Sequence, residues 1–256
     1  MEQWSDDAIV IAARSHGESG AVVTLLTCEH GKHAGYVHGG QSLKKRPHMQ
    51  IGSRVKAQWI SRTADDLGRY QLEPVQVVSP DIMASALKLG ALSAACSLCE
   101  SALPDREAHP GLFHGLQTLI ETLDSDVWGA SYIVWEVALL KELGYGLNLT
   151  VCAGGGDENT LAYVSPKSGR AVSEAAAQPY KEKLLPLPAF LTPHKKGANE
   201  QEIMTGLEMT GYFLEHWVYA HHSKGVPEAR LRFEGRYAKQ LHARSDNDLN
   251  DMEDCA

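Results

Sequence analysis

The sequence predicts an α+β protein in which a small closed β-sheet precedes an α-helical domain. Up to position 79, short apolar runs rich in Val, Ile, Thr, Tyr and Trp alternate with breaks that contain Gly, Asp and Pro. From position 80 onward the apolar residues recur at spacings of three and four, which is the period of a helix. The chain has 256 residues, 43% of them hydrophobic, so both parts can form a core.

Five strands are expected in the first part, at residues 8–15, 21–27, 32–39, 53–63 and 69–79. No helical pattern interrupts them, and an open sheet of this size would leave two exposed edges, so we expect the sheet to close into a barrel. A five-stranded OB-fold barrel is the commonest such structure, and an SH3-like barrel fits the same number of strands. We assign this domain to residues 1–79.

A helical domain is assigned to residues 80–244. Its first helix is expected to run from Pro80 to Pro104, with Ser79 as the cap and Asp81 placed to complement the helix dipole. Further helices are expected at 110–124, 127–146, 199–222 and 227–242. In the third, one face collects apolar residues that we assign to the core and not to a binding surface: Trp128, Tyr132, Trp135, Leu139 and Leu143.

Two segments of the second part lack a helical pattern. Residues 148–177 form an irregular insert that contains Gly and Ser. The terminal stretch "SDNDLNDMEDCA", residues 245–256, holds five acidic residues and few apolar ones, so we expect it to be disordered. It would serve as a solubilising end or as an autoinhibitory mimic of DNA.

Composition indicates a cytoplasmic protein. No apolar run reaches the roughly 18 residues of a membrane helix, and the N-terminus lacks a basic-then-apolar leader. The five cysteines are odd in number and irregularly spaced, which argues against a disulfide framework. Cys96 and Cys99 fall within an apolar helix and are assigned to its buried face, not to a zinc site. His221 and His222 point about 100° apart on a helix and receive no metal role.

No catalytic motif stands out. The sequence contains no GxSxG, GxxxxGK[ST], HExxH or GxGxxG pattern, so we expect no enzymatic activity.

Positive charge gathers in the first domain, although the whole chain has a formal net charge of -8. Residues 1–79 hold nine Lys and Arg against eight Asp and Glu, and three of the cations are adjacent in "GGQSLKKRP". A barrel face with cations and aromatic residues can follow a single-stranded phosphate backbone, and Tyr36 and Trp59 could supply the aromatic part. The alternative is a merely solvated loop. The predicted DNA-binding residues are Arg14, His38, Lys44, Lys45, Arg46, Arg54, Lys56 and Arg62.

A second basic cluster lies near the end of the helical domain. Three of its members share one helical face, which would suit phosphates or the acidic peptide of a partner. An ordinary solvated helix face is the alternative. The predicted partner-binding residues are Arg230, Arg232, Arg236 and Lys239.

The chain as a whole resembles the bacterial recombination mediator RecO family. The resemblance rests on the N-terminal 32 residues, "VHGGQSLKKR", "IGSRVKAQWISR", "WEVALLKELGYGLNLTVCAGGG" and "GVPEARLRF". It implies an N-terminal OB fold, a helical C-terminal domain and a cytoplasmic, nucleoid-associated protein. It also implies binding to single- and double-stranded DNA, annealing, and action with RecR and single-strand-binding protein to load recombinase. The acidic tail of single-strand-binding protein would then be the partner of the second basic cluster.

The resemblance also implies a zinc-finger-like insert, where many relatives carry two CxxC pairs. Here only Cys152 of the four cysteines is present, and Gly155, Ser173 and Ala176 occupy the other positions. A structural zinc site needs four ligands, so we expect the insert to fold without metal and the protein to need no cofactor. Its apolar anchors would be Leu161, Tyr163, Val164 and Val172.

We interpret the sequence as a non-enzymatic DNA-binding mediator of recombinational repair. Two other functions remain open. A protein-interaction adaptor would use its barrel to bind a partner protein, and its binding would depend weakly on salt. A metal-dependent nuclease would need a carboxylate cluster that the sequence does not display.

Overall fold

The computed structural model describes residues 1–193 and 197–253. The chain forms two compact units, residues 1–124 and residues 125–256, which we call the N-terminal and C-terminal units. The boundary between these units falls after the third helix, whereas the sequence patterns change at position 79. The first three helices therefore belong to the same compact unit as the sheet.

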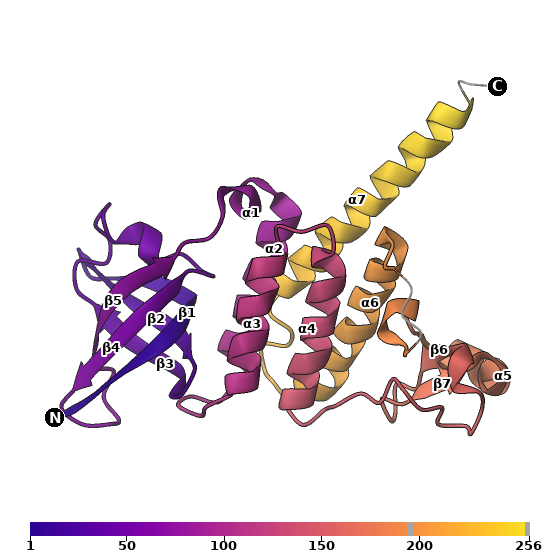
Figure 1. The fold of residues 1–256 in the computed structure, drawn as a ribbon, viewed down its shortest axis with the longest axis horizontal. Helices are drawn as coiled ribbons and strands as arrows, with labels where there is room; N and C mark the ends of the chain where they lie inside the picture. The colour runs from indigo at the N-terminus through magenta and orange to yellow at the C-terminus, as the bar shows by residue number, and fades with distance from the viewer. Residues whose placement is uncertain (194–196, 254–256) are drawn as a thin grey trace. The chain divides into compact units, whose positions relative to one another are not determined.

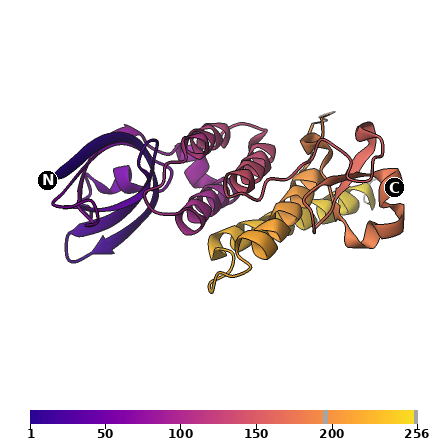
Figure 2. The same cartoon turned by 90° about the horizontal axis from the view of Figure 1, so that it is seen from below.

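Five strands form a closed barrel in the order β1-β2-β3-β5-β4, and the sequence prediction of a five-stranded barrel is thereby confirmed. Neighbouring strands are antiparallel except β3 and β5, which run parallel and share one residue pair, Tyr36 with Arg69. The curvature of the strands is clearest in Figure 2. The strands are β1 (Glu2–His16), β2 (Gly20–Thr27), β3 (Gly31–Val37), β4 (Arg54–Ser61) and β5 (Arg69–Gln76).

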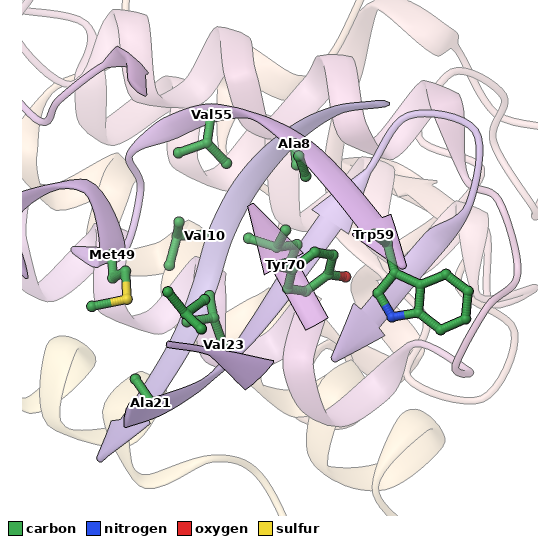
Figure 3. Packing of buried hydrophobic residues seen from close by; sticks show 11 residues of the cluster. Ala8, Val10, Ala21, Val23, Met49, Val55, Trp59 and Tyr70 are labelled. Carbon is green, nitrogen blue, oxygen red and sulfur yellow. The ribbon is translucent and has the colours of Figure 1, made fainter. Parts of the chain in front are cut away.

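Alternate residues of the strands fill the barrel. On β4, Val55, Ala57 and Trp59 point inward and are at most 2% exposed, while Lys56 and Gln58 between them are exposed. A short 3₁₀ helix in the β3–β4 loop, η1 (Arg46–Met49), adds Met49 to this core. Figure 3 shows Met49 within the same cluster as Val10, Val23 and Tyr70.

Strand β1 is buried on both faces in its middle. Residues 8–11 are all at most 2% exposed, because Ala8 and Val10 face the barrel interior and helix α2 packs against the strand from outside. This explains why the sequence there is a continuous apolar run. The register with β2 shifts between Val10 and Ala12, as at a β-bulge.

The predicted first helix is divided in two, α1 (Pro80–Ala84) and α2 (Ala86–Ala102), and the expectation of one helix was wrong here. Ser85 between them is extended, with ψ at 114°, and its hydroxyl accepts a hydrogen bond from the Lys88 N–H. A serine that caps the following helix competes with continuation of the preceding one. Ser79 caps α1 as predicted, and α3 (Pro110–Thr122) completes the unit.

The C-terminal unit is built on three helices, α4 (Trp128–Glu142), α6 (Glu200–Phe213) and α7 (Glu228–Glu253), with α6 packed against both others. The predicted core face of α4 is confirmed: Tyr132, Trp135 and Leu139 are buried, and Trp128 and Leu143 are partly buried. After α6 the chain makes one π-helical turn, Leu214–Val218.

The insert contributes β6 and β7 to a small three-stranded sheet of order β7-β6-β8, in which β8 follows the insert in the chain. Strands β6 and β7 lie beside α5 in Figure 1. Its anchors are as predicted, with Leu161, Val164 and Val172 buried and Tyr163 partly buried. The elements are β6 (Leu161–Val164), β7 (Ala171–Ser173), α5 (Glu174–Ala177) and β8 (Leu185–Pro186).

Helix α7 continues through residues 245–253 of the segment predicted to be disordered. No Gly or Pro occurs between positions 236 and 253, so no residue in this stretch breaks the helix. Residues 254–256 of that segment lie outside the described residues. No described helix is long and apolar enough to span a membrane.

Candidate nucleic-acid interface

The loop that joins β3 to β4 is fixed to the barrel at both of its ends. At the first end, the Gln41 side-chain amide donates to the backbone oxygens of Gly17 and Gly20, at 3.0 Å each. At the second end, the buried Met49 side chain lies in the barrel core. The Lys45 ammonium also donates to the His38 carbonyl at 2.9 Å, across the base of the loop. The tip at residues 42–46 is exposed, so a fixed frame presents it to solvent.

Five predicted DNA-binding cations are exposed and make no ion pair with any described residue: Lys44, Lys45, Arg46, Lys56 and Arg62. The first three form the loop tip, and His38 at its base is also exposed. These side chains can give their full charge to a ligand. Lys56 has a mixed neighbourhood, because Asp7 on β1 and Glu73 on β5 lie directly across from it in the sheet.

The other two predicted cations are already engaged by carboxylates of the N-terminal unit. The Arg14 guanidinium lies 2.5 Å from Glu100 on α2, and Arg54 lies 3.7 Å from Glu121 on α3. Arg14 is 70% exposed, so the pair with Glu100 is open to competition, whereas Arg54 is only 27% exposed. A phosphate that binds Arg14 has to displace a carboxylate first.

Tyr36 and Trp59, which were predicted to form a stacking surface for bases, are not placed as that prediction requires. Trp59 is 2% exposed and donates its indole N–H to the Leu67 carbonyl at 3.0 Å, so in this structure it is a core residue and cannot stack on a base. Tyr36 is partly buried, with its hydroxyl against Gly20. Sequence reasoning missed Trp4, a partly exposed residue packed against the barrel core whose ring stacks on His30 with 4.2 Å between centroids.

His30 is oriented by a buried carboxylate. The Asp6 carboxylate accepts hydrogen bonds from the backbone N–H groups of Glu29 and His30, at 2.8 and 3.2 Å, and lies 2.9 Å from the His30 ring nitrogen. His33, deeper in the barrel, differs: burial and the charge of Arg106 lower its pKa to about 4. His33 is therefore neutral near pH 7.

Two cavities flank the basic loop. The first, about 790 Å³, contains Arg14 and Arg46. The second, about 720 Å³, contains Lys45 and Lys56 together with His38 and His48. The loop thus contributes a cation to the lining of each cavity, Arg46 to the first and Lys45 to the second.

Of the four predicted partner-binding cations on α7, three are exposed and one is buried. Arg230 is fully buried and its guanidinium lies 2.5 and 3.0 Å from the two carboxylate oxygens of Glu136, so it does not reach a surface. Arg232 is exposed but lies 3.3 Å from Glu228. Arg236 and Lys239 are exposed without an ion pair among the described residues, and Leu231 nearby is 55% exposed.

In the insert, several hydrogen-bond donors surround the sulfur of Cys152. Cys152 is buried, and its sulfur lies 3.5 Å from the Ser173 hydroxyl and 3.2 Å from the Ser173 backbone nitrogen. Burial alone would raise the pKa of the thiol, but hydrogen bonds from Ser173 and from the N–H groups of Gly154 and Gly156 lower it to about 7. Among the described residues, no group of three His, Cys, Asp or Glu is arranged to bind a metal ion.

Comparison with known proteins gives the same match for both parts of the chain. Residues 1–78 match the family model for the N terminus of recombination protein O, and residues 83–224 match that for its C terminus. Curated relatives named "DNA repair protein RecO" include those of Rhodospirillum centenum, 46% identical over 93% of this chain and 95% of the relative, and Caulobacter sp. strain K31, 45% identical over 90% and 95%. The protein of Caulobacter vibrioides NA1000 is 44% identical over 93% and 98%.

Proposed function

Since the chain belongs to the recombination protein O family, we propose that it acts in DNA repair and recombination as a non-enzymatic mediator. It binds and anneals single-stranded DNA and helps to load recombinase on strands coated by single-strand-binding protein. Its partners are single- and double-stranded DNA, RecR and the acidic tail of single-strand-binding protein. It acts in the cytoplasm, at the nucleoid.

The observation that carries the DNA part of this proposal is the fixed loop tip with Lys44, Lys45 and Arg46. All three are exposed and form no ion pair with a described residue, and both ends of the loop are tied to the barrel. A cation that forms no ion pair within the protein gains most from a phosphate, because no existing ion pair has to be broken. Counterions released from the strand then add to the affinity whatever the net charge of the protein.

Annealing needs no nucleophile or general base. A surface that holds strands by their phosphates leaves the base edges free to pair, and the free energy of annealing comes from base pairing and stacking.

The direct test is a salt titration of single-strand binding by the intact chain. Log affinity should fall linearly with log salt, with a slope of about -0.7 for each phosphate that the protein neutralises. Binding that is insensitive to salt would contradict the proposal.

An adaptor that binds a protein partner is the second candidate, and one observation favours it. Leu43, in the middle of the basic tip, is 88% exposed, as an apolar anchor for a protein partner would be. Leu43→Ala separates the two functions: it should leave strand binding unchanged if the tip contacts phosphates, and should weaken partner binding if the adaptor function is correct.

A further inference from the structure

Tyr36 lies on the outer face of the barrel wall, whereas Trp59 belongs to the interior cluster drawn in Figure 3. On β3, residues 31, 33, 35 and 37 are buried, and Tyr36 between the last two is partly exposed. Its partners across the sheet, Val22 on β2 and Arg69 on β5, also alternate with buried, inward-facing residues. Tyr36 and Trp59 therefore do not share a surface, and the surroundings of Tyr36 are those of the outer face.

The Tyr36 side chain lies along this outer face and does not stand away from it. Tyr36 is paired with Val22, yet its hydroxyl reaches Gly20, two residues away on β2. A Cβ atom at Gly20 would be 2.1 Å from the Tyr36 hydroxyl oxygen and 2.4 Å from two ring carbons, so glycine is the residue that leaves room for the ring. A ring that is held along the sheet and is only partly buried presents part of its aromatic surface to solvent.

Two exposed histidines, His16 and His38, lie beside the Tyr36 ring, with 6.0 and 6.5 Å between ring centroids. Farther along the same strands the outer face is covered, because α2 packs against β1 and α3 against β2, and the paired residues Ile9 and Leu26 are fully buried. The open part of the outer face is thus the end next to the basic loop, and Tyr36 supplies its aromatic surface.

Arginines flank Tyr36 in one row across the sheet. The row runs from Arg14 through Val22 and Tyr36 to Arg69. Arg69 is exposed and forms no ion pair with a described residue, whereas Arg14 is paired with Glu100. Neighbouring strands are about 4.8 Å apart, so Arg69 can reach a phosphate of a nucleotide whose base lies on Tyr36.

We propose that the Tyr36 ring stacks one base of a bound single strand, with the adjoining phosphate at Arg69. The inference rests on the proposed DNA binding and adds a contact with the bases to it. Stacking on an aromatic ring tolerates every base, so it suits a protein that binds strands of any sequence. His38 connects this site to the basic loop, because it follows Tyr36 by two residues and its carbonyl accepts the hydrogen bond from Lys45. One strand can therefore contact the loop tip through its phosphates and Tyr36 through a base.

The test compares two strands of equal length on the intact chain, a thymidine oligomer and a base-free deoxyribose-phosphate oligomer. The thymidine strand should bind about tenfold tighter, which is the effect of one stacked base. Tyr36→Leu should lose most of this preference and keep its affinity for the base-free strand, whereas Tyr36→Phe, which retains the ring, should retain the preference. Tyr180→Leu is the matched control: Tyr180 is 62% exposed, lies in the C-terminal unit and should behave as wild type when replaced.

The phosphate contact has its own test. Arg69→Ala should weaken the binding of both strands and reduce the salt slope by about 0.7, because it removes a phosphate contact and no base contact. An unchanged slope would overturn the role of Arg69.

Photo-cross-linking of wild-type protein from 4-thiothymidine in the same oligomer locates the base directly. Cross-links should fall within residues 33–44, the tryptic peptide that contains Tyr36. Equal affinity of the wild type for both strands, an unchanged preference in Tyr36→Leu, its loss in Tyr36→Phe, or cross-links confined to other peptides would overturn the inference. If both strands bind equally and with a steep salt dependence, the proposed function stands without it; if neither strand binds, both are wrong.

Discussion

The guanidinium of Arg14 on β1 lies 2.5 Å from the carboxylate of Glu100 on α2, 86 positions later in the chain. If Arg14 binds a DNA phosphate, as we propose, that phosphate has to compete with this carboxylate. We therefore expect Glu100→Gln to raise single-strand affinity and to steepen the salt slope by about 0.7, because one more cation becomes available. Glu107→Gln removes the same charge from an exposed residue that forms no ion pair among the described residues, and should have a smaller effect. Equal effects of both variants would mean that only net charge matters.

The loop tip is expected to bind several phosphates of the strand. Lys44→Ala/Arg46→Ala should weaken single-strand binding and reduce the salt slope by about 0.7 for each phosphate that is no longer neutralised, to a similar extent on mixed and homopolymeric strands. Adding Lys45→Ala removes a third charge and also the hydrogen bond to the His38 carbonyl. Fluorescence anisotropy over a range of salt concentrations measures both quantities, and a slope unchanged in the triple variant would place the DNA elsewhere.

The insert is expected to fold without zinc. Purified protein should contain well under one zinc per chain, and a chelator should leave its melting temperature unchanged, because Ser173 faces the one cysteine that is present. Metal analysis and thermal unfolding with and without chelator check this. One zinc per chain would show that ligands other than Cys152 complete a site.

The exposed face of α7 is expected to bind the acidic tail of single-strand-binding protein. Arg232→Glu/Arg236→Glu should abolish binding of the isolated acidic peptide, because two charge-assisted hydrogen bonds are replaced by repulsion, and should leave binding of naked single strands intact. Lys224→Glu, outside α7, is the control. Isothermal titration with the peptide measures the effect. Full peptide affinity in the double variant would mean that the peptide binds elsewhere on the protein. Loss of both peptide binding and single-strand binding would mean that these arginines also contact DNA.

His33 is expected to make the stability of the N-terminal unit depend on pH. Its pKa is about 4 in the folded chain, below its ordinary value of 6.5, because it is buried near Arg106. Between those values the unfolded chain binds a proton that the folded chain does not, so stability falls as the pH falls from about 6.5 to 4. His33→Gln should flatten this part of the curve of denaturant midpoint against pH, whereas exposed His16→Gln should leave it unchanged.

Much of the fold was predictable because its signals are local. Alternation along β4 predicts which side chains face the barrel, and the same alternation places Trp59 inward with Val55 and Ala57, a signal against its use as a stacking surface. Arg230 could have been assigned to the core in the same way, since it shares a helical face with Phe233 and Tyr237, both buried. Its surface assignment followed its charge alone.

The rest depends on interactions between distant positions. Neither composition nor periodicity relates Arg14 to Glu100 or Arg54 to Glu121, so the sequence could not show that two of the predicted DNA-binding cations are engaged. Ser85 is both the C-cap of α1 and the N-cap of α2, and periodicity alone does not show which serine of this apolar stretch interrupts the helix. The parallel pairing of β3 with β5 that closes the barrel, Tyr36 with Arg69, joins strands that are not consecutive in the chain, and strand patterns do not encode such a pairing.

Gln41 and Met49 attach the β3–β4 loop to the barrel on either side of its tip. The side chains of the tip can therefore be replaced together while the two attachment points stay in place. Residues 42–46 make no contribution to the buried cluster that holds the barrel together. The charge and chemistry of these side chains can therefore be changed by design with little effect on the barrel core. The same scaffold could then be retuned for strands, duplexes or protein partners by altering five exposed positions.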